Sequence, residues 1–204
     1  TLLKRIDNRP SDSKIKIFRG ASRFNHNFTI KESKPPFKIG LVGGNFNQKG
    51  ISFCNVMLNE LTRRKIPIIF INFGGNEDIQ RYLKKNATYP FEVRSKGELG
   101  ESDYSELDAL AVLSTYETYS LSTLEGMSLS IPIISSDLNG VFYDAKDKVL
   151  GRVKDISNKD ETADMMERLL FDRIFKDSTI KSGHEITHHT WKDLSLMIEK
   201  EYEK

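Results

Sequence analysis

The run IPIIFI at residues 66–71 constrains the fold of this chain more than any other feature. Its apolar and β-branched residues occupy neighbouring positions instead of alternating with polar ones. A strand with one face in water alternates, whereas a strand covered on both faces reads as a continuous apolar run. The run therefore predicts a strand inside a sheet that has helices on both faces.

Strand-like and helix-like segments alternate from Pro36 to the end of the chain. Besides 66–71, strands are expected at 37–43, 91–95, 109–114 and 131–136. Helices are expected at 51–64, 77–85, 120–130 and 161–172, and from Thr190 onward. This order predicts an α/β fold, a doubly wound, Rossmann-like parallel sheet over residues 35–204.

The composition excludes several classes of protein. The 204 residues carry 31 Lys and Arg against 29 Asp and Glu without a basic block, so no nucleic-acid partner is expected. The single cysteine, Cys54, rules out an internal disulfide and indicates a reducing, cytoplasmic setting. No apolar run approaches the ~20 residues that span a bilayer, and no signal peptide is visible.

The beginning of the chain differs from the rest in its composition and in its lack of a regular hydrophobic pattern. Residues 1–34 are polar and irregular, and we expect them to be a linker or an inter-domain crossover segment. The first residue is Thr1 and not Met, so we expect the chain to be part of a longer protein.

Two carboxylates flank the Ser/Thr-rich turn between the strands 109–114 and 131–136. Glu117 follows the first of these strands, and Glu125 lies in the next helix. Between them, the amides of Tyr119, Ser120 and Leu121 are expected at the helix N-terminus, which favours an anion such as a diphosphate. The carboxylates repel phosphate but accept hydrogen bonds from hydroxyls. An anion between two hydroxyl-bearing groups describes a nucleotide-sugar.

The same stretch resembles a motif of a large family of retaining glycosyltransferases, the family 4-like group 1 enzymes of the two-domain GT-B fold. ETYSLSTLE is similar to the family's E-x7-E, and LEGMSLSIPIISSDLNG is similar to the segment that follows it. Upstream, LVGGNFNQKG resembles the family's phosphate loop, and INFGGNED resembles its glycine turn. Downstream, HTWKDLSLMIEKEY resembles its terminal helix. The likeness runs in order from about residue 37 to residue 204.

The resemblance implies a role for each site residue. Glu125 is expected to hold the ribose hydroxyls and Glu117 the hydroxyls of the donor sugar, while Lys49 neutralises the departing diphosphate with help from the amides of residues 119–121. The Gly43–Gly44 turn is expected to let the donor approach the backbone. The usual Arg of the phosphate loop is replaced by Gly44, so one phosphate cation is missing.

The resemblance also implies the reaction and its participants. A hexose would pass from a UDP- or GDP-sugar to a sugar, lipid-linked or protein acceptor without a metal ion. The family's acceptor-binding domain would precede these residues, so this chain alone is expected to be inactive. Peripheral association of the full enzyme with the inner face of the membrane is a further implication.

Several alternatives stay open from the sequence alone. Gly44 fits a non-catalytic binding or accessory domain of the same fold, and a nucleotide-sugar epimerase would share the fold as well. An unrelated doubly wound module for another phosphate ligand would not need Glu125. Taken singly, Glu117 and Glu125 are ordinary solvated acids, and Lys49 is an ordinary surface lysine.

Overall fold

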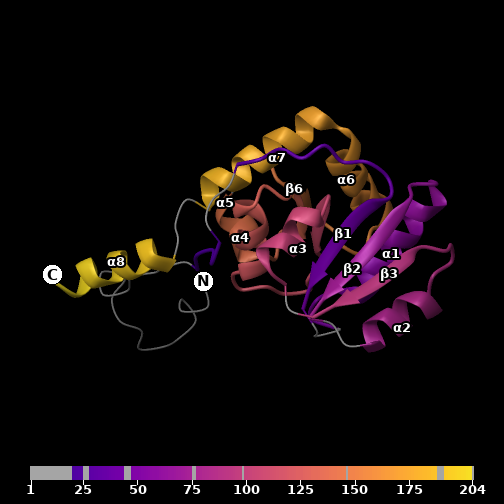
Figure 1. Cartoon of the computed structure of the whole chain (residues 1–204), viewed down its shortest axis with the longest axis horizontal. Helices are drawn as coiled ribbons and strands as arrows, with labels where there is room; N and C mark the ends of the chain where they lie inside the picture. The colour runs from indigo at the N-terminus through magenta and orange to yellow at the C-terminus, as the bar shows by residue number, and fades with distance from the viewer. Residues whose placement is uncertain are drawn as a thin grey trace.

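Six parallel strands form one sheet in the part of the chain that the computed structural model describes, residues 20–24, 28–43, 47–74, 77–97, 99–145, 147–187 and 191–203. The strand order is β3-β2-β1-β4-β5-β6. Figure 1 shows β3, β2 and β1 side by side at one end of the sheet. The strands are β1 Phe37–Val42, β2 Ile68–Phe73, β3 Glu92–Lys96, β4 Ala109–Val112, β5 Ile133–Ser136 and β6 Gly151–Val153. This arrangement confirms the predicted doubly wound, Rossmann-like sheet.

Helices cover both faces of the sheet (Figure 1). One face packs against α1 Ile51–Arg63, α2 Glu77–Lys85 and α6 Lys159–Phe171. The other face packs against α3 Glu101–Glu106, α4 Leu121–Ser128 and α5 Gly140–Ala145. Helix α7, Arg173–Ile186, contacts both α6 and α4, and so joins the two layers at one edge.

The position of β2 between β3 and β1 explains the continuous apolar run. All six residues of β2 are buried. Ile68 and Phe70 belong to the hydrophobic cluster on one face, whereas Ile69 and Ile71 belong to the cluster on the other. Because side chains alternate between the faces of a strand, a strand between two helical layers needs apolar residues at consecutive positions.

Two predicted strands begin later than expected because of prolines. The strand predicted at 66–71 is β2, Ile68–Phe73, and the strand predicted at 131–136 is β5, Ile133–Ser136. Pro67 and Pro132 have no N–H to donate, and each contributes only its carbonyl, to the amides of Phe37 and Leu110. The regular ladder therefore starts one residue after each proline.

The last predicted helix is α8, Trp191–Tyr202, and Thr190, its predicted cap, lies outside the described residues. None of its residues is buried. The helix lies apart from the sheet and its covering helices (Figure 1). Its apolar side chains, among them Leu196 and Met197, therefore remain exposed and do not join the core of the described domain.

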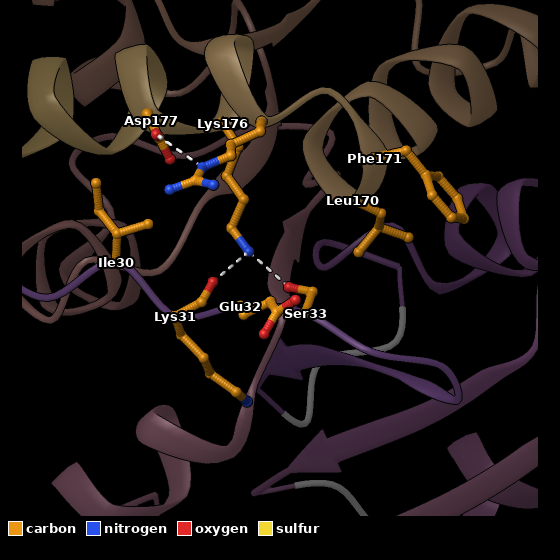
Figure 2. Close-up of a pocket in the computed structure, with 9 residues that line it drawn as sticks. Ile30, Lys31, Glu32, Ser33, Leu170, Phe171, Lys176 and Asp177 are labelled. Carbon is orange, nitrogen blue, oxygen red and sulfur yellow. Dashed lines mark hydrogen bonds and ion pairs between the residues drawn. The ribbon is translucent and has the colours of Figure 1, made fainter.

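Residues 28–34 run as a strap along α7 and lead into β1 (Figure 1). The buried ammonium of Lys176 on α7 donates to the carbonyl of Lys31 at 3.0 Å and to Ser33 Oγ at 2.5 Å. The amide of Thr29 donates to Ser130 Oγ at 3.1 Å. Beside these anchors lies a pocket of about 440 Å³ between the strap and the junction of α6 and α7 (Figure 2).

Glu60 near the end of α1 makes the stability of the fold depend on pH. Hydrogen bonds from Arg63 and then Arg64 lower the pKa of Glu60 from 4.5 to about 2, although burial opposes the shift. Because the folded-state pKa is depressed, the carboxylate stabilises the fold above pH 4.5. That contribution is lost as the pH falls from 4.5 towards 2.

Glu60→Gln is expected to lower the free energy of unfolding at pH 6 by about 1–2 kcal/mol. The value is kept small because Arg63 is exposed, and water screens its interaction with Glu60. The difference between the two proteins should shrink towards pH 3. Urea unfolding at both pH values measures it, with Glu77→Gln, an exposed acid on α2, as the control. A difference that is the same at both pH values would contradict the assigned role of Glu60.

Candidate functional site

The predicted site residues gather at one edge of the sheet, beyond the carboxyl ends of β1 and β4. These two strands are neighbours, and the order of the sheet reverses between them. The segment after β1 leads to α1 on one face, and the segment after β4 leads to α4 on the other. A crevice forms at such a reversal, and ligands of open α/β sheets bind there.

The β1–α1 loop brings Lys49 to this edge. Gly43 has φ +122°, and a Cβ there would lie 2.7 Å from Lys49 Cε, so the lysine side chain lies directly against the glycine. Gly50 has φ +63°, and a Cβ there would lie 1.9 Å from the carbonyl oxygen of Leu113. Only glycine permits both the conformation and the close approach. The other predicted glycine, Gly44, lies outside the described residues.

Lys49 and Glu117, the two predicted catalytic residues, are in direct contact. Lys49 Nζ lies 2.9 Å from Glu117 Oε2, and Ser114 Oγ donates to the same oxygen at 3.2 Å. The backbone of Glu117 is fixed as well, because its carbonyl accepts from the amide of Gly140 at 3.1 Å. A cation and a carboxylate are thus held together beyond the carboxyl ends of β1 and β4.

The N-terminus of α4 follows directly after this pair. Ser120 is the N-cap residue, and its hydroxyl accepts from the amide of Thr123 at 3.3 Å. Leu121 is the first helical residue and is exposed, whereas Tyr119 is half-buried. First-turn amides have no partner four residues earlier in the helix, so this turn presents partial positive charge. The predicted helix and its N-terminus are confirmed at this position.

Glu125 lies on the first turns of α4 and is buried. Its side chain is 11% exposed. Tyr104 Oη on α3 donates to Glu125 Oε2 at 2.9 Å, and Arg23 Nε lies 2.8 Å from Glu125 Oε1. Burial, followed by the adjacent Glu125 carboxylate, raises the pKa of Tyr104 well above its usual range, so the hydroxyl remains a donor.

The segment 20–24 covers this end of α4. A Cβ on Gly20 would lie 3.1 Å from Leu121 Cδ2 and 3.3 Å from Tyr119 Cδ1. Ala21 and Ser22 are buried. The segment therefore lies over the residues that the sequence predicts to bind a diphosphate, while Arg23 contacts the residue predicted to bind ribose.

Sequence reasoning missed Tyr104 and Arg23. Neither has a local motif, and both reach Glu125 only through the tertiary fold. Ser114 was expected at the end of a strand but not as a partner of Glu117. Within the described residues, no three His, Cys, Asp or Glu side chains form a metal-binding group. The same residues contain no helix long and apolar enough to cross a membrane.

The fold and the site define a doubly wound domain with a lysine–carboxylate pair and a helix N-terminus at the reversal of the sheet. The chain belongs to the glycosyl transferases group 1, whose family model matches residues 36–172. An uncharacterized glycosyltransferase of Methanocaldococcus jannaschii is 24% identical over 212 residues, which cover 93% of this chain and 54% of the relative.

Solved structures agree with the fold. HepE of Anabaena, determined in complex with UDP-glucose, has a TM-score of 0.69 at 13% identity, covering 83% of this chain and 49% of HepE. Sucrose-phosphate synthase of Thermosynechococcus elongatus has a TM-score of 0.66 at 21% identity, covering 82% of this chain and 45% of the synthase. These neighbours are GT-B glycosyltransferases. The chain spans about half the length of each of these relatives.

Proposed function

We propose that this chain is the nucleotide-sugar-binding domain of a retaining glycosyltransferase that transfers a hexose from a UDP- or GDP-sugar. The observation that carries the proposal is the Lys49–Glu117 pair, 2.9 Å apart, next to the N-terminus of α4 at the reversal of the sheet. A diphosphate is bound by a cation and by backbone amides at a helix N-terminus, and a sugar is bound by an acceptor for its hydroxyls. Lys49, the start of α4 and Glu117 bring these groups together.

Each residue takes one part of the donor in this proposal. The amides at Tyr119, Ser120 and Leu121 bind the diphosphate at the helix N-terminus. Lys49 balances the charge that develops on the diphosphate as the bond to the sugar breaks, which is the task of a divalent metal ion in other enzymes. Glu117 accepts hydrogen bonds from the sugar hydroxyls, and Glu125 accepts them from the ribose.

Lys49 must gain a second partner when the donor binds. Its ammonium has three donors, so it can keep Glu117 and reach a phosphate oxygen at the same time. In that state the lysine also orients the carboxylate towards the sugar. The tight approach of Lys49 to Gly43 limits how far the ammonium can move from Glu117.

The acceptor belongs to a part of the protein that these residues do not contain. We propose that a second domain presents a sugar, lipid-linked or protein acceptor to the crevice, in the cytoplasm or at the inner face of the membrane. This chain alone should then bind nucleotide but transfer little or no sugar. Robust transfer by the isolated chain, measured as release of UDP or GDP with an acceptor present, would refute this division of labour.

Thermal unfolding with UDP, GDP, ADP and their hexose conjugates tests donor binding. A ligand at ten times its dissociation constant adds about 1.4 kcal/mol of stability. For a domain of this size the unfolding midpoint rises by about 3–5 °C. A shift with UDP or GDP but not with ADP is the expected result. Of the two nucleotides, we expect UDP to give the larger shift. HepE was solved with UDP-glucose, and TarM of Staphylococcus aureus was solved with UDP.

A non-catalytic binding domain is the second candidate, because Gly44 stands where the related motif has arginine. A charge-assisted contact to a leaving diphosphate matters most in the transition state. Such a domain would bind the nucleotide-sugar as described here. The complete protein would then release no nucleoside diphosphate from the donor, whether or not an acceptor is present.

A further inference from the structure

We propose that the two carboxylate oxygens of Glu125 have different tasks, a proposal that rests on the proposed function. Tyr104 is a positioning residue that holds Oε2 permanently. Arg23 holds Oε1 only in the empty domain, and the ribose of a bound nucleotide replaces it. The segment 20–24 is therefore an internal competitor of the donor.

Tyr104 is built to hold the carboxylate in one orientation. Its side chain is fully buried, and its hydroxyl donates to Glu125 Oε2 at 2.9 Å. A buried hydrogen bond to a charged acceptor is strong and is costly to break. Tyr104 therefore stays in place when a ligand arrives.

The ion pair of Arg23 with Glu125 is weaker than the Tyr104 hydrogen bond. The side chain of Arg23 is 52% exposed, and its guanidinium lies 4.7 Å from the centre of the Phe24 ring. Besides Glu125, it donates to the carbonyl of Leu99 at 2.6 Å. An ion pair with one exposed partner contributes little to stability, because water and salt screen it. A ligand that supplies hydroxyl donors can therefore exchange with the guanidinium.

The covering segment makes this exchange necessary. Gly20 lies beside the side chains of Tyr119 and Leu121, and Arg23 occupies Glu125 Oε1. A ribose hydroxyl can take the place of the guanidinium at that oxygen only after Arg23 has moved. Displacement of the Arg23 side chain must therefore accompany donor binding.

The strap of residues 28–34 can remain in place while ribose replaces Arg23 at Glu125. Lys176 holds the backbone of Lys31 and the hydroxyl of Ser33 (Figure 2). Ser130 holds the amide of Thr29. These anchors lie after the covering segment in the chain, and none of them involves Arg23. The contact that is exchanged and the contacts that hold residues 29–33 are thus separate.

Calorimetric titration of Arg23→Ala and Tyr104→Phe with UDP, GDP and their 2′,3′-dideoxy analogues tests the proposal. Arg23→Ala should bind the nucleotide roughly two- to five-fold more tightly, because the internal competitor has lost its charge. Tyr104→Phe should bind UDP or GDP roughly ten-fold more weakly. It should bind the dideoxy analogue as the wild type does, since that ligand has no hydroxyls for Glu125.

Two matched variants control for general effects. Arg81→Ala removes an exposed arginine that pairs with Asp78 on α2, and Tyr82→Phe removes the hydroxyl of a half-buried tyrosine on the opposite face of the sheet. Both should bind nucleotide as the wild type does. The unfolding midpoint of each variant without ligand shows that it is folded.

The outcomes separate this inference from the proposed function. Weaker binding by Arg23→Ala, or equal losses of ribo- and dideoxynucleotide binding by Tyr104→Phe, would overturn the inference and leave the donor site standing. Nucleotide binding by Arg23→Ala but not by the wild type would support the inference, because Arg23 would then mask Glu125 in the wild type. If neither the wild type nor Arg23→Ala binds UDP or GDP at millimolar concentration, both proposals fall.

Discussion

Replacing Glu125 with alanine is expected to weaken UDP or GDP binding by about 100-fold. Two ribose hydroxyls would lose a charged, largely buried acceptor, and each hydrogen bond is taken at the low end of the range for charged acceptors, about 1.5 kcal/mol. The variant also leaves the buried hydroxyl of Tyr104 without its acceptor, which should lower the free energy of unfolding by about 1–3 kcal/mol. Calorimetric titration and urea unfolding measure the two effects separately.

Two further variants make this result specific. Glu125→Gln keeps the volume and one acceptor oxygen, so we expect an intermediate loss of roughly ten-fold. Glu106→Ala removes a partly exposed acid on α3 that pairs with Lys38, and it should leave nucleotide binding unchanged. Undiminished binding by Glu125→Ala would favour the alternative of an unrelated phosphate-binding module.

Gly50→Ala is expected to cause the largest loss of stability, about 3–5 kcal/mol of unfolding free energy. The left-handed conformation of Gly50 costs a residue with a side chain about 1 kcal/mol or more. The added Cβ would also lie 1.9 Å from the carbonyl oxygen of Leu113, so the start of α1 must move away from the end of β4. Lys49 precedes Gly50 directly, and its pairing with Glu117 should be lost together with nucleotide binding.

Two other glycines provide a graded control for the Gly50 variant. Gly74 has φ +65° but open space around its Cβ position, so Gly74→Ala should cost only the conformational strain, about 1 kcal/mol. Gly97 has neither a left-handed φ nor a neighbour within 4 Å, and Gly97→Ala should be close to neutral. Urea unfolding ranks the three variants, and equal effects would show that the close approach to Leu113 does not matter.

Much of the layered architecture could be predicted because burial imposes patterns on neighbouring residues. Strands covered on both faces need continuous apolar runs, and β1, β2 and β4 all contain one. The crossover order then requires a doubly wound sheet. The position of Glu117 and Glu125 around the start of α4 followed from this order alone.

Other elements gave no usable signal in the sequence. Strand β6 has only three residues, too few for a period to show. Helix α7 contains Gly183, which is a poor helix former. In the fold, Gly183 allows close packing, because a Cβ there would lie 2.9 Å from Met127 Cγ. Such tertiary contacts override local propensity.

The partners of Glu125 could not be found from spacing either. Tyr104 and Arg23 reach it from other parts of the chain, so no periodicity links them to the E-x7-E motif. Ser130 is a related case: it stands where the motif has glycine, and it adopts φ +60° in the fold. Its hydroxyl accepts from Thr29, so this departure from the motif helps to hold the strap.

Amide chemical-shift mapping with UDP and GDP tests the central claim most directly. If the donor binds at the reversal of the sheet, the shifts should cluster at Lys49, Glu117, residues 119–121 and Glu125. Shifts confined to another surface, such as the pocket beside Lys176 in Figure 2, would contradict the account.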